Sequence, residues 1–433
     1  MRPSADALAR MRRFIEATWR LNRVAVSRDA TRTCEIIAEE IGGEILRVPS
    51  GSECLTWIIP PRWEVEEAYV ETLDGERILD YRDNPLHVCL YSAPFEGVLD
   101  LEELRPHLHS SEAMPDDIPF HNRWTYRPGD FTEWGFCLPH NRYRRLRPAR
   151  YRVVLRATFQ PGEMAVHHAS ARGQHENTLF VFAHTCHPGQ VNDGVACIAV
   201  AMELFRGLVR RREGLRYSYR VIFGPEYHAA AGYLTHAKGI EHLRYGISLD
   251  MMANYQPLGF SRSFLGDTYL DKATRNVMAH HVPGSFERAY RDLWGNDEMF
   301  YDGPDFRIPV VTIGRDKFPA YHHSSDDLEH CNWAQMEDTL SVLQRLVQVF
   351  ETDRRLRRRY RGPLYLSRYG LYIDPKKERA GARALQQIQI LMDGERSYLE
   401  IADALKIDFE FVRRFGDELL QLGLAEEDPT FAP

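Results

Sequence analysis

The sequence predicts an α/β protein with a mainly parallel, doubly wound sheet, and two observations lead to this expectation. Between about residues 152 and 350, short apolar runs of strand length alternate with longer amphipathic stretches. Such alternation is typical of parallel sheets that carry helices on both faces. Polar side chains also stand directly after several of the apolar runs, where open α/β sheets place their ligand sites.

The alternating elements follow one another without long gaps. Strand-like runs at 179–182, 219–223 and 245–249 are separated by helical patterns at 195–211 and 229–237. Apolar residues in the first helical pattern recur at spacings of three and four, which gives that helix one apolar face. The runs are short and mostly apolar, as expected of buried strands.

Two regions before residue 152 show a different pattern of apolar residues. Residues from about 5 to 45 show helical spacing of apolar side chains. Residues 53–150 contain short β-rich runs, such as 67–70 and 87–91, separated by turn residues. This texture predicts a small, mostly β subdomain. We therefore expect an α/β domain formed by residues 1–52 and 151–375, with residues 53–150 inserted into it.

Residues 376–433 show the order helix, turn, helix, helix and short strand, with the turn at 393–395, which is typical of a winged helix. From Glu378 onward the segment carries twelve acids and six bases, and this balance disfavours contact with phosphates. We expect packing or homo-oligomerisation as its role. The arginine-rich stretch at 354–361 before it is predicted to be a solvated helix end and linker.

Composition narrows the class of protein further. The net charge of −7 over 433 residues argues against a nucleic-acid or membrane-surface binder. Seven scattered cysteines without a CxxC pair indicate neither a disulfide framework nor a cysteine-rich zinc knuckle. The first residues lack a signal-peptide core, and no apolar run approaches the roughly 20 residues of a membrane span. A cytoplasmic protein is expected.

Candidate metal ligands stand at four places, each just after a strand-like run. They are His184, His187 and Asp193 after the first run, Glu226 after the second, Asp250 after the third, and Tyr321, His322 and Asp326 further on. Any one has an ordinary explanation, since Asp250 could cap a helix and Asp193 could form an Asx turn. Four at successive strand ends favour a divalent metal, zinc by preference.

The order of these motifs resembles the M28-type zinc aminopeptidases. The matching elements are His184, Asp193-Gly194-x-Ala196, Pro225-Glu226, Leu249-Asp250-Met251 and Tyr321-His322-x-Ser324-x-Asp326. The whole chain is similar to a bacterial aminopeptidase-like family in which this domain carries an inserted β subdomain and a C-terminal winged helix. That likeness rests on 57–63, 134–137, Cys186-His187-Pro188 and 295–298.

The resemblance implies a role for each motif residue. Asp193 would be the central or bridging carboxylate, with Asp250 and His322 as further ligands of one metal. His187 would be the ligand from the segment after the first strand-like run, with His184 as the alternative. Glu226 would be the general base, and Tyr321 and Asp326 would orient His322. The second glutamate of the family's pair is replaced by Tyr227, so one zinc ion or two is left open.

These expectations lead to three functional hypotheses. The leading one is a zinc-dependent hydrolase of amide bonds in short peptides or aminoacyl conjugates. The second is a deacylase of amino-sugar or natural-product intermediates. The third is a catalytically degenerate, metal-stabilised binding or assembly protein, which Tyr227 favours. A retained Glu226 argues against the third, because a binding site needs no spare carboxylate beside its metal.

Overall fold

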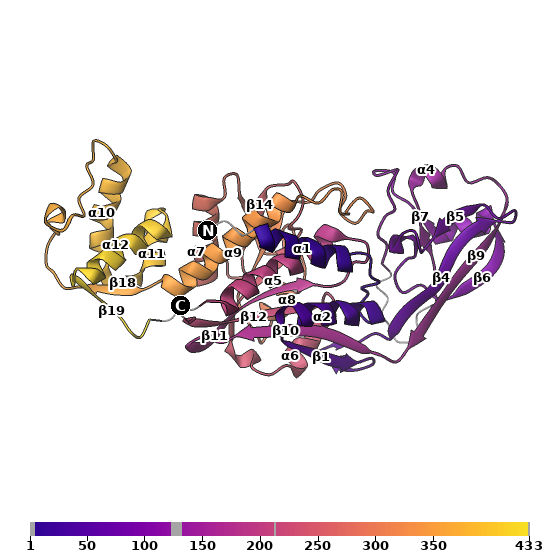
Figure 1. Ribbon diagram of the computed structural model, residues 1–433, viewed down its shortest axis with the longest axis horizontal. Helices are drawn as coiled ribbons and strands as arrows, with labels where there is room; N and C mark the ends of the chain where they lie inside the picture. Colours follow the sequence, from indigo (N-terminus) through magenta and orange to yellow (C-terminus); the bar gives the residue numbers. More distant parts are fainter. Residues whose placement is uncertain (1–4, 123–131, 212–213, 432–433) are drawn as a thin grey trace.

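The chain folds into three parts that follow one another along the longest axis of the molecule (Figure 1). An α/β part lies in the middle, a β-rich part at one end and the C-terminal residues at the other. The computed structural model describes residues 5–122, 132–211 and 214–431. Within those ranges, every helix is too short or too polar to span a lipid bilayer.

The central sheet has eight strands in the order β1-β10-β12-β11-β13-β16-β14-β15. Their bounds are β1 (Glu44–Pro49), β10 (Glu163–Ala171), β11 (His175–His184), β12 (Tyr217–Gly224), β13 (Leu243–Asp250), β14 (Leu258–Ser261), β15 (Phe286–Arg288) and β16 (Val310–Arg315). The four middle strands are parallel, and so is the edge pair β14–β15, whereas the pairs β1–β10, β10–β12 and β14–β16 are antiparallel. The sheet is therefore mixed, and the predicted parallel arrangement is confirmed in part.

The connection between β10 and β11 explains part of this difference. Only residues 172–174 separate the two strands, and parallel neighbours need a crossover of a dozen or more residues. The chain consequently reverses direction here, and β12 lies between the two strands, antiparallel to β10 and parallel to β11. An apolar run does not reveal the direction of its strand. The sequence alone therefore could not distinguish parallel from antiparallel pairing.

Helices cover both faces of the sheet, as predicted. The helices are α1 (Ala5–Thr18), α2 (Arg28–Ile41), α5 (Ala196–Val209), α7 (Tyr269–His281) and α9 (Trp333–Thr352) on one face, and α6 (His228–His236) and α8 (Glu298–Tyr301) on the other. Alternate residues of β11 divide accordingly: Leu179 and Val181 join the first core, and Phe180 and Phe182 join the second. Residues pointing to opposite faces of one strand thus hold two helical layers.

The β-rich part contains a four-stranded antiparallel sheet in the order β5-β4-β9-β6. Its strands and short flanking elements are β4 (Arg62–Thr72), β5 (Arg77–Asp80), β6 (Phe95–Asp100), α3 (Leu101–Leu104), β7 (Leu108–His109), β8 (Phe136–Cys137), α4 (His140–Tyr143) and β9 (Arg150–Gln160). The short strands β2 (Glu53–Cys54) and β3 (Trp57–Ile58) precede them in sequence and pack against α6 of the α/β part. The part has an apolar core of its own around Trp63. Its status as an inserted subdomain stays a prediction.

One predicted strand in this part is wrong. Residues 87–91 form no strand: a turn of 3-10 helix at Pro85–His87 leads into isolated bridges at Val88 and Leu90. Asn84 caps this turn by accepting a hydrogen bond from the backbone N–H of Leu86. The proline and its capping residue therefore override the β-rich composition that follows them.

The C-terminal residues form three helices and a three-stranded sheet. The elements are β17 (Arg355–Arg358), α10 (Arg379–Leu391), β18 (Asp393–Ser397), α11 (Tyr398–Leu405), α12 (Phe409–Gln421) and β19 (Ala425–Glu427), and β17 lies between β18 and β19. Two predictions are corrected here: part of the arginine-rich linker is strand β17, and the turn at 393–395 lies within β18. The winged-helix assignment stays a prediction.

Opposite charges explain why the arginine-rich stretch is ordered. Arg354 and Arg359 pair with Glu427 and Glu426 at 2.6 and 3.0 Å. Leu356, between them in sequence, is almost completely buried. The acids that argued against DNA binding thus neutralise arginines of the same part of the chain, and one apolar side chain anchors the strand.

Asp353, at the end of α9, joins the α/β part to the C-terminal residues. Its carboxylate accepts hydrogen bonds from the Tyr269 hydroxyl at 2.8 Å and the Leu399 backbone N–H at 3.1 Å. Burial raises the pKa of Asp353 to about 6. Because this pKa lies above the value for an unfolded chain, stability present at low pH is lost as the pH rises through about 6.

We expect Asp353→Asn, which removes the ionisable group, to lose less stability than the wild type between pH 5 and pH 8. The difference in unfolding free energy between variant and wild type should shift in favour of the variant by about 1–2 kcal/mol over this range. Urea unfolding at both pH values measures the shift. The exposed Asp267→Asn variant is the control, and a constant difference at both pH values would contradict the prediction.

Candidate metal centre

The ends of the parallel strands bring the predicted site residues together. β11 ends at His184, β13 ends at Asp250, and Glu226 follows β12 by two residues. Seven of the eight predicted residues line one cavity of about 280 Å³, namely His184, His187, Asp193, Glu226, Asp250, Tyr321 and His322. The cavity lies at the carboxyl edge of the sheet, as expected for an open α/β fold.

Asp193 is the centre of this cluster. Its Oδ1 lies 3.0 Å from His184 Nε2 and 3.6 Å from His187 Nδ1, and its Oδ2 lies 3.0 Å from His322 Nε2. The potential donor atoms of His184, Asp193 and Asp250 all lie within 4.8 Å of one another. The same holds for His187, Asp193 and His322. Two donor groups therefore share one carboxylate.

This grouping differs from the assignment that the resemblance implied. Around Asp193, His184 and His187 fall in different donor groups, and the two histidines also form a group with Cys186. Asp250 and His322, expected on one metal, likewise fall in different groups. The sequence order of the motifs could not reveal this division, which depends on how the loop after β11 folds back.

The cluster fits a metal ion better than it fits a hydrogen-bond network. Asp193 Oδ2 and His322 Nε2 are buried and, within the described part of the chain, have no hydrogen-bond partner although they are only 3.0 Å apart. Burial opposes ionisation of Asp193, but His187, His184 and His322 outweigh it and hold its pKa well below the usual range. An ionised carboxylate among imidazoles is a donor set that zinc prefers.

The backbone at the site is held in an uncommon conformation. His187, Tyr227, Met251 and His322 all have positive φ, at 70°, 60°, 49° and 59°. Each such residue costs free energy, and residues of this kind cluster at functional sites. Gly194 also matters, because a Cβ there would lie 2.8 Å from Cε1 of the His184 ring. Local backbone strain therefore accompanies the orientation of the side chains at this site.

Asp326 acts on Asp193, not on His322 as expected. The Asp326 carboxylate accepts hydrogen bonds from the backbone N–H and side-chain amide of Asn192, at 2.8 and 2.9 Å, and from the backbone N–H of Asp193 at 3.1 Å. Tyr321 does meet His322, since their rings stack with centroids 3.9 Å apart. Asp326 therefore fixes the turn that carries Asp193, and Tyr321 contacts His322.

We expect Asp326→Asn to weaken zinc binding about 10- to 100-fold, the usual effect of losing a group that orients a ligand. The amide nitrogen introduced by the change cannot accept the hydrogen bond that one carboxylate oxygen now accepts. Competition with a chromophoric chelator measures the affinity. The half-buried Asp327, which pairs with His330, offers Asp327→Asn as a neighbouring control, and equal zinc affinity in the Asp326 variant and the wild type would contradict the prediction.

Arg23 is a residue of the site that the sequence did not indicate. Its buried guanidinium donates hydrogen bonds to the backbone carbonyls of Thr185, Cys186, His187 and Gln190, at 2.6, 3.0, 2.7 and 3.1 Å. These carbonyls belong to the loop that carries His187. A single arginine after a helix resembles an ordinary surface residue, so no sequence signal distinguished it.

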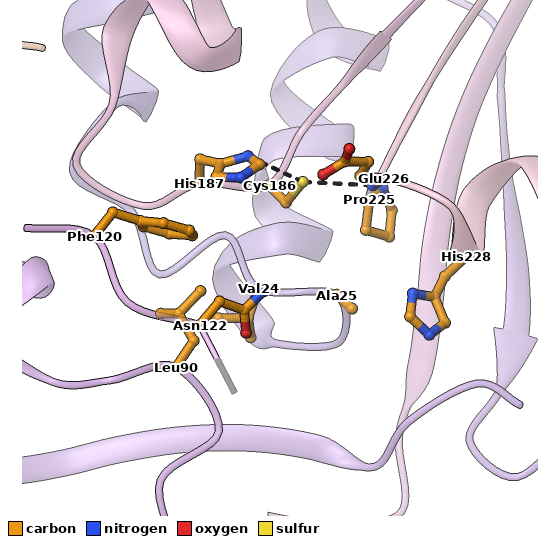
Figure 2. A pocket seen from close by; sticks show the side chains of 10 residues that line it. All are labelled: Val24, Ala25, Leu90, Phe120, Asn122, Cys186, His187, Pro225, Glu226 and His228. Carbon is orange, nitrogen blue, oxygen red and sulfur yellow. Dashed lines mark hydrogen bonds between the residues drawn. The ribbon is translucent and has the colours of Figure 1, made fainter. Parts of the chain in front are cut away.

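The β-rich part supplies one wall of the site. The ring of Phe120 lies against the rings of His187 and His322, with centroids 4.7 and 4.9 Å away, and its backbone N–H donates to the His322 carbonyl at 2.7 Å. Figure 2 shows Phe120 and Leu90 below His187 and Cys186, and these residues line one small cavity together with Glu226. Phe120 therefore belongs to the wall of the site.

Solved structures share this architecture. A crystal structure of a protein from Clostridium acetobutylicum, provisionally described as a peptidase, superposes with a TM-score of 0.88 at 24% identity, covering 98% of this chain and 97% of the other. The zinc aminopeptidase BSAP from Bacillus subtilis gives a TM-score of 0.56 at 13% identity, with 79% and 93% covered. A peptidase M28 precursor from Shewanella amazonensis gives 0.56 at 12%, with 80% and 93% covered.

The chain therefore has the fold of solved zinc aminopeptidases, and histidines and carboxylates gather at the carboxyl edge of its sheet. A curated relative from Clostridium acetobutylicum is 26% identical over 432 residues, covering 95% of this chain and 94% of the relative. Its provisional name is polysaccharide biosynthesis protein with aminopeptidase-like domain. The family described as domain of unknown function DUF4910 matches residues 12–353, and the chain belongs to this family.

Proposed function

We propose that this protein is a zinc-dependent hydrolase of amide bonds, with Glu226 as the general base. The observation that carries the proposal is that Glu226 lines the same cavity as the two donor groups around Asp193 and belongs to neither. A hydrolytic metal site needs such a spare carboxylate beside its ligands. Zinc held by these donors would supply Lewis acidity, which activates a water molecule and polarises a carbonyl group.

Each side chain then has a defined task. Burial raises the pKa of Glu226 to about 8, so its carboxylate is a stronger proton acceptor than an exposed glutamate. It would take a proton from the attacking water and deliver it to the leaving amine. His184, Asp193 and Asp250 would hold one zinc ion, and His187, Asp193 and His322 a second. Phe120 and Tyr321 would limit the access of bulk water.

His187 could replace the glutamate that Tyr227 removes from the ligands of a second metal ion. The resemblance leaves the second metal without a glutamate, since Tyr227 stands in its place. The Tyr227 hydroxyl donates to the carbonyl of Gly295 at 3.2 Å, and its ring stacks on Trp57. His187 instead contributes a nitrogen to the donor group of Asp193 and His322. We therefore favour two zinc ions, with an imidazole in place of the missing carboxylate.

We expect His187→Asn to lower the zinc content of the cavity by about one ion per chain, because only the second donor group loses a member. Tyr227→Phe should leave the zinc content unchanged. Elemental analysis of the purified variants gives both numbers. A Tyr227→Phe variant that lost zinc, or a His187→Asn variant that kept all of it, would contradict the assignment of His187.

A second substrate class is favoured by the name of the Clostridium acetobutylicum relative, which mentions polysaccharide biosynthesis. The same chemistry would then remove an acyl group from the nitrogen of an amino sugar. Turnover of a panel of aminoacyl amides and N-acyl amino sugars separates the two. Activity only on the first supports an aminopeptidase, and activity only on the second supports a deacylase. Inactivity of zinc-loaded protein on both would contradict the proposed function.

A further inference from the structure

A second cluster of metal-binding side chains lies in the β-rich part, separate from Asp193. Cys89, His109 and His121 each offer one donor atom, and these three atoms lie within 4.8 Å of one another. Cys89 is fully buried, and the two histidines are half-buried. A thiolate with two imidazoles is a donor set for zinc and related transition metals, not for magnesium or calcium. We propose that this cluster is a structural zinc site.

The backbone holds the three donors in place from separate segments. The Cys89 N–H donates to the Gly135 carbonyl, and the N–H of Leu90 donates to the His121 carbonyl, both at 3.0 Å. His109 lies in β7, which pairs in parallel with β8 so that His109 is opposite Cys137. Hydrogen bonds within the backbone therefore fix the positions from which the side chains converge. Such preorganisation is what a metal site requires of its scaffold.

Gly135 keeps the space between two of the donors open. A Cβ at this position would lie 3.1 Å from Cys89 Sγ and 3.1 Å from His109 Nε2. Any larger residue would push the thiol and the imidazole away from each other. Gly135 has no positive φ, so the requirement for glycine here is space and not backbone conformation.

The position of the cluster indicates what the zinc ion would do. Leu90 follows Cys89, and Phe120 and Asn122 flank His121 in the sequence. These three neighbours line the small cavity that also includes His187 and Glu226 (Figure 2). A zinc ion on Cys89, His109 and His121 would cross-link the segments that form this wall. It would stabilise Phe120 against His187 and His322 without taking part in the reaction.

Cys137 supplies the main alternative to zinc. Its Sγ lies 3.7 Å from Cys89 Sγ, and the two residues are not disulfide-bonded in this structure. Two thiolates on one tetrahedral zinc ion would be about 3.8 Å apart for Zn–S bonds of about 2.3 Å. Two thiols in van der Waals contact have a similar spacing. Oxidation of this pair to a disulfide would remove the thiolate that zinc needs, so the test must distinguish the two states.

The experiment uses the full-length Asp193→Asn variant, in which the two donor groups that contain Asp193 are incomplete, although His184, Cys186 and His187 remain together. We expect this variant to retain about one zinc ion per chain, and to lose it when Cys89→Ser is added. Adding Cys34→Ser, which changes a cysteine that is equally buried but distant from the cluster, should leave that ion in place. Cobalt substituted for zinc should show a sulfur-to-metal charge-transfer band that disappears with Cys89→Ser and persists with Cys186→Ser.

Two further measurements test the zinc site even if the Cys89→Ser variant does not fold. In the Asp193→Asn background, His121→Gln should reduce the zinc content in the same way. A strong chelator should lower the melting temperature of the Asp193→Asn protein. A folded Asp193→Asn protein that binds no zinc when zinc is added would overturn the proposal. So would thiol counting that shows Cys89 and Cys137 joined in a disulfide in the purified protein.

Discussion

Replacing Glu226 by glutamine is expected to reduce kcat by about 10²- to 10⁴-fold, the usual contribution of a general base. The amide has nearly the same shape as the carboxylate but cannot accept a proton at neutral pH. Glu226 belongs to neither donor group, so the zinc content of the variant should equal that of the wild type. The loss therefore reports on proton transfer and not on an empty site.

Steady-state kinetics with the best substrate of the panel, together with elemental analysis of the same samples, measures both quantities. Glu329→Gln changes an exposed acid in the loop after His322 and is the matched control, expected to retain full activity. A Glu226→Gln variant that keeps more than about a tenth of the wild-type kcat would contradict the role of general base. A variant that loses zinc would indicate that Glu226 is a ligand.

Replacing Asp193 by asparagine should remove about two zinc ions per chain and all measurable activity. Asp193 is the one residue common to both donor groups, and an amide oxygen is a much weaker zinc ligand than a carboxylate. The neighbouring histidines, which depress the pKa of Asp193, would also lose the negative charge that they surround. The loss should therefore be larger than for any histidine of the cavity.

Elemental analysis before and after incubation with zinc measures the change, and circular dichroism checks that the variant is folded. Asp267→Asn is the control for the charge change. If Asp193→Asn lost only one ion, the carboxylate would serve a single metal, and the two-ion arrangement proposed for His187 would be wrong. If it lost none, Asp193 would not be a zinc ligand, and the assignment of both donor groups would be wrong.

The sequence predicted the strand ends of this site well because the strand ends carry a local signal. The runs at 179–182, 219–223 and 245–249 are mostly apolar, and the structure extends each by only a few residues into β11, β12 and β13. Polar residues that follow buried strands must face a crevice or solvent. The prediction that His184, Glu226 and Asp250 meet therefore needed only the order of elements.

Other features depended on contacts between distant segments. Arg23 reaches the loop after β11 across more than 160 residues of sequence, and Phe120 arrives from the β-rich part. His187 and His322, which share a donor group with Asp193, both have positive φ. No periodicity encodes such a conformation, because it is imposed by the surrounding structure and not by the residue itself.

The central position of β17 has a consequence for any shortened form of the protein. A chain ending at residue 375, the predicted domain boundary, would keep β17 but lose both neighbours, β18 and β19. Both edges of β17 would then carry unpaired backbone groups, and its arginines would lose Glu426 and Glu427. Unprotected strand edges promote self-association. Such a truncated protein should therefore aggregate, whereas one ending before Arg354 would not carry the strand at all.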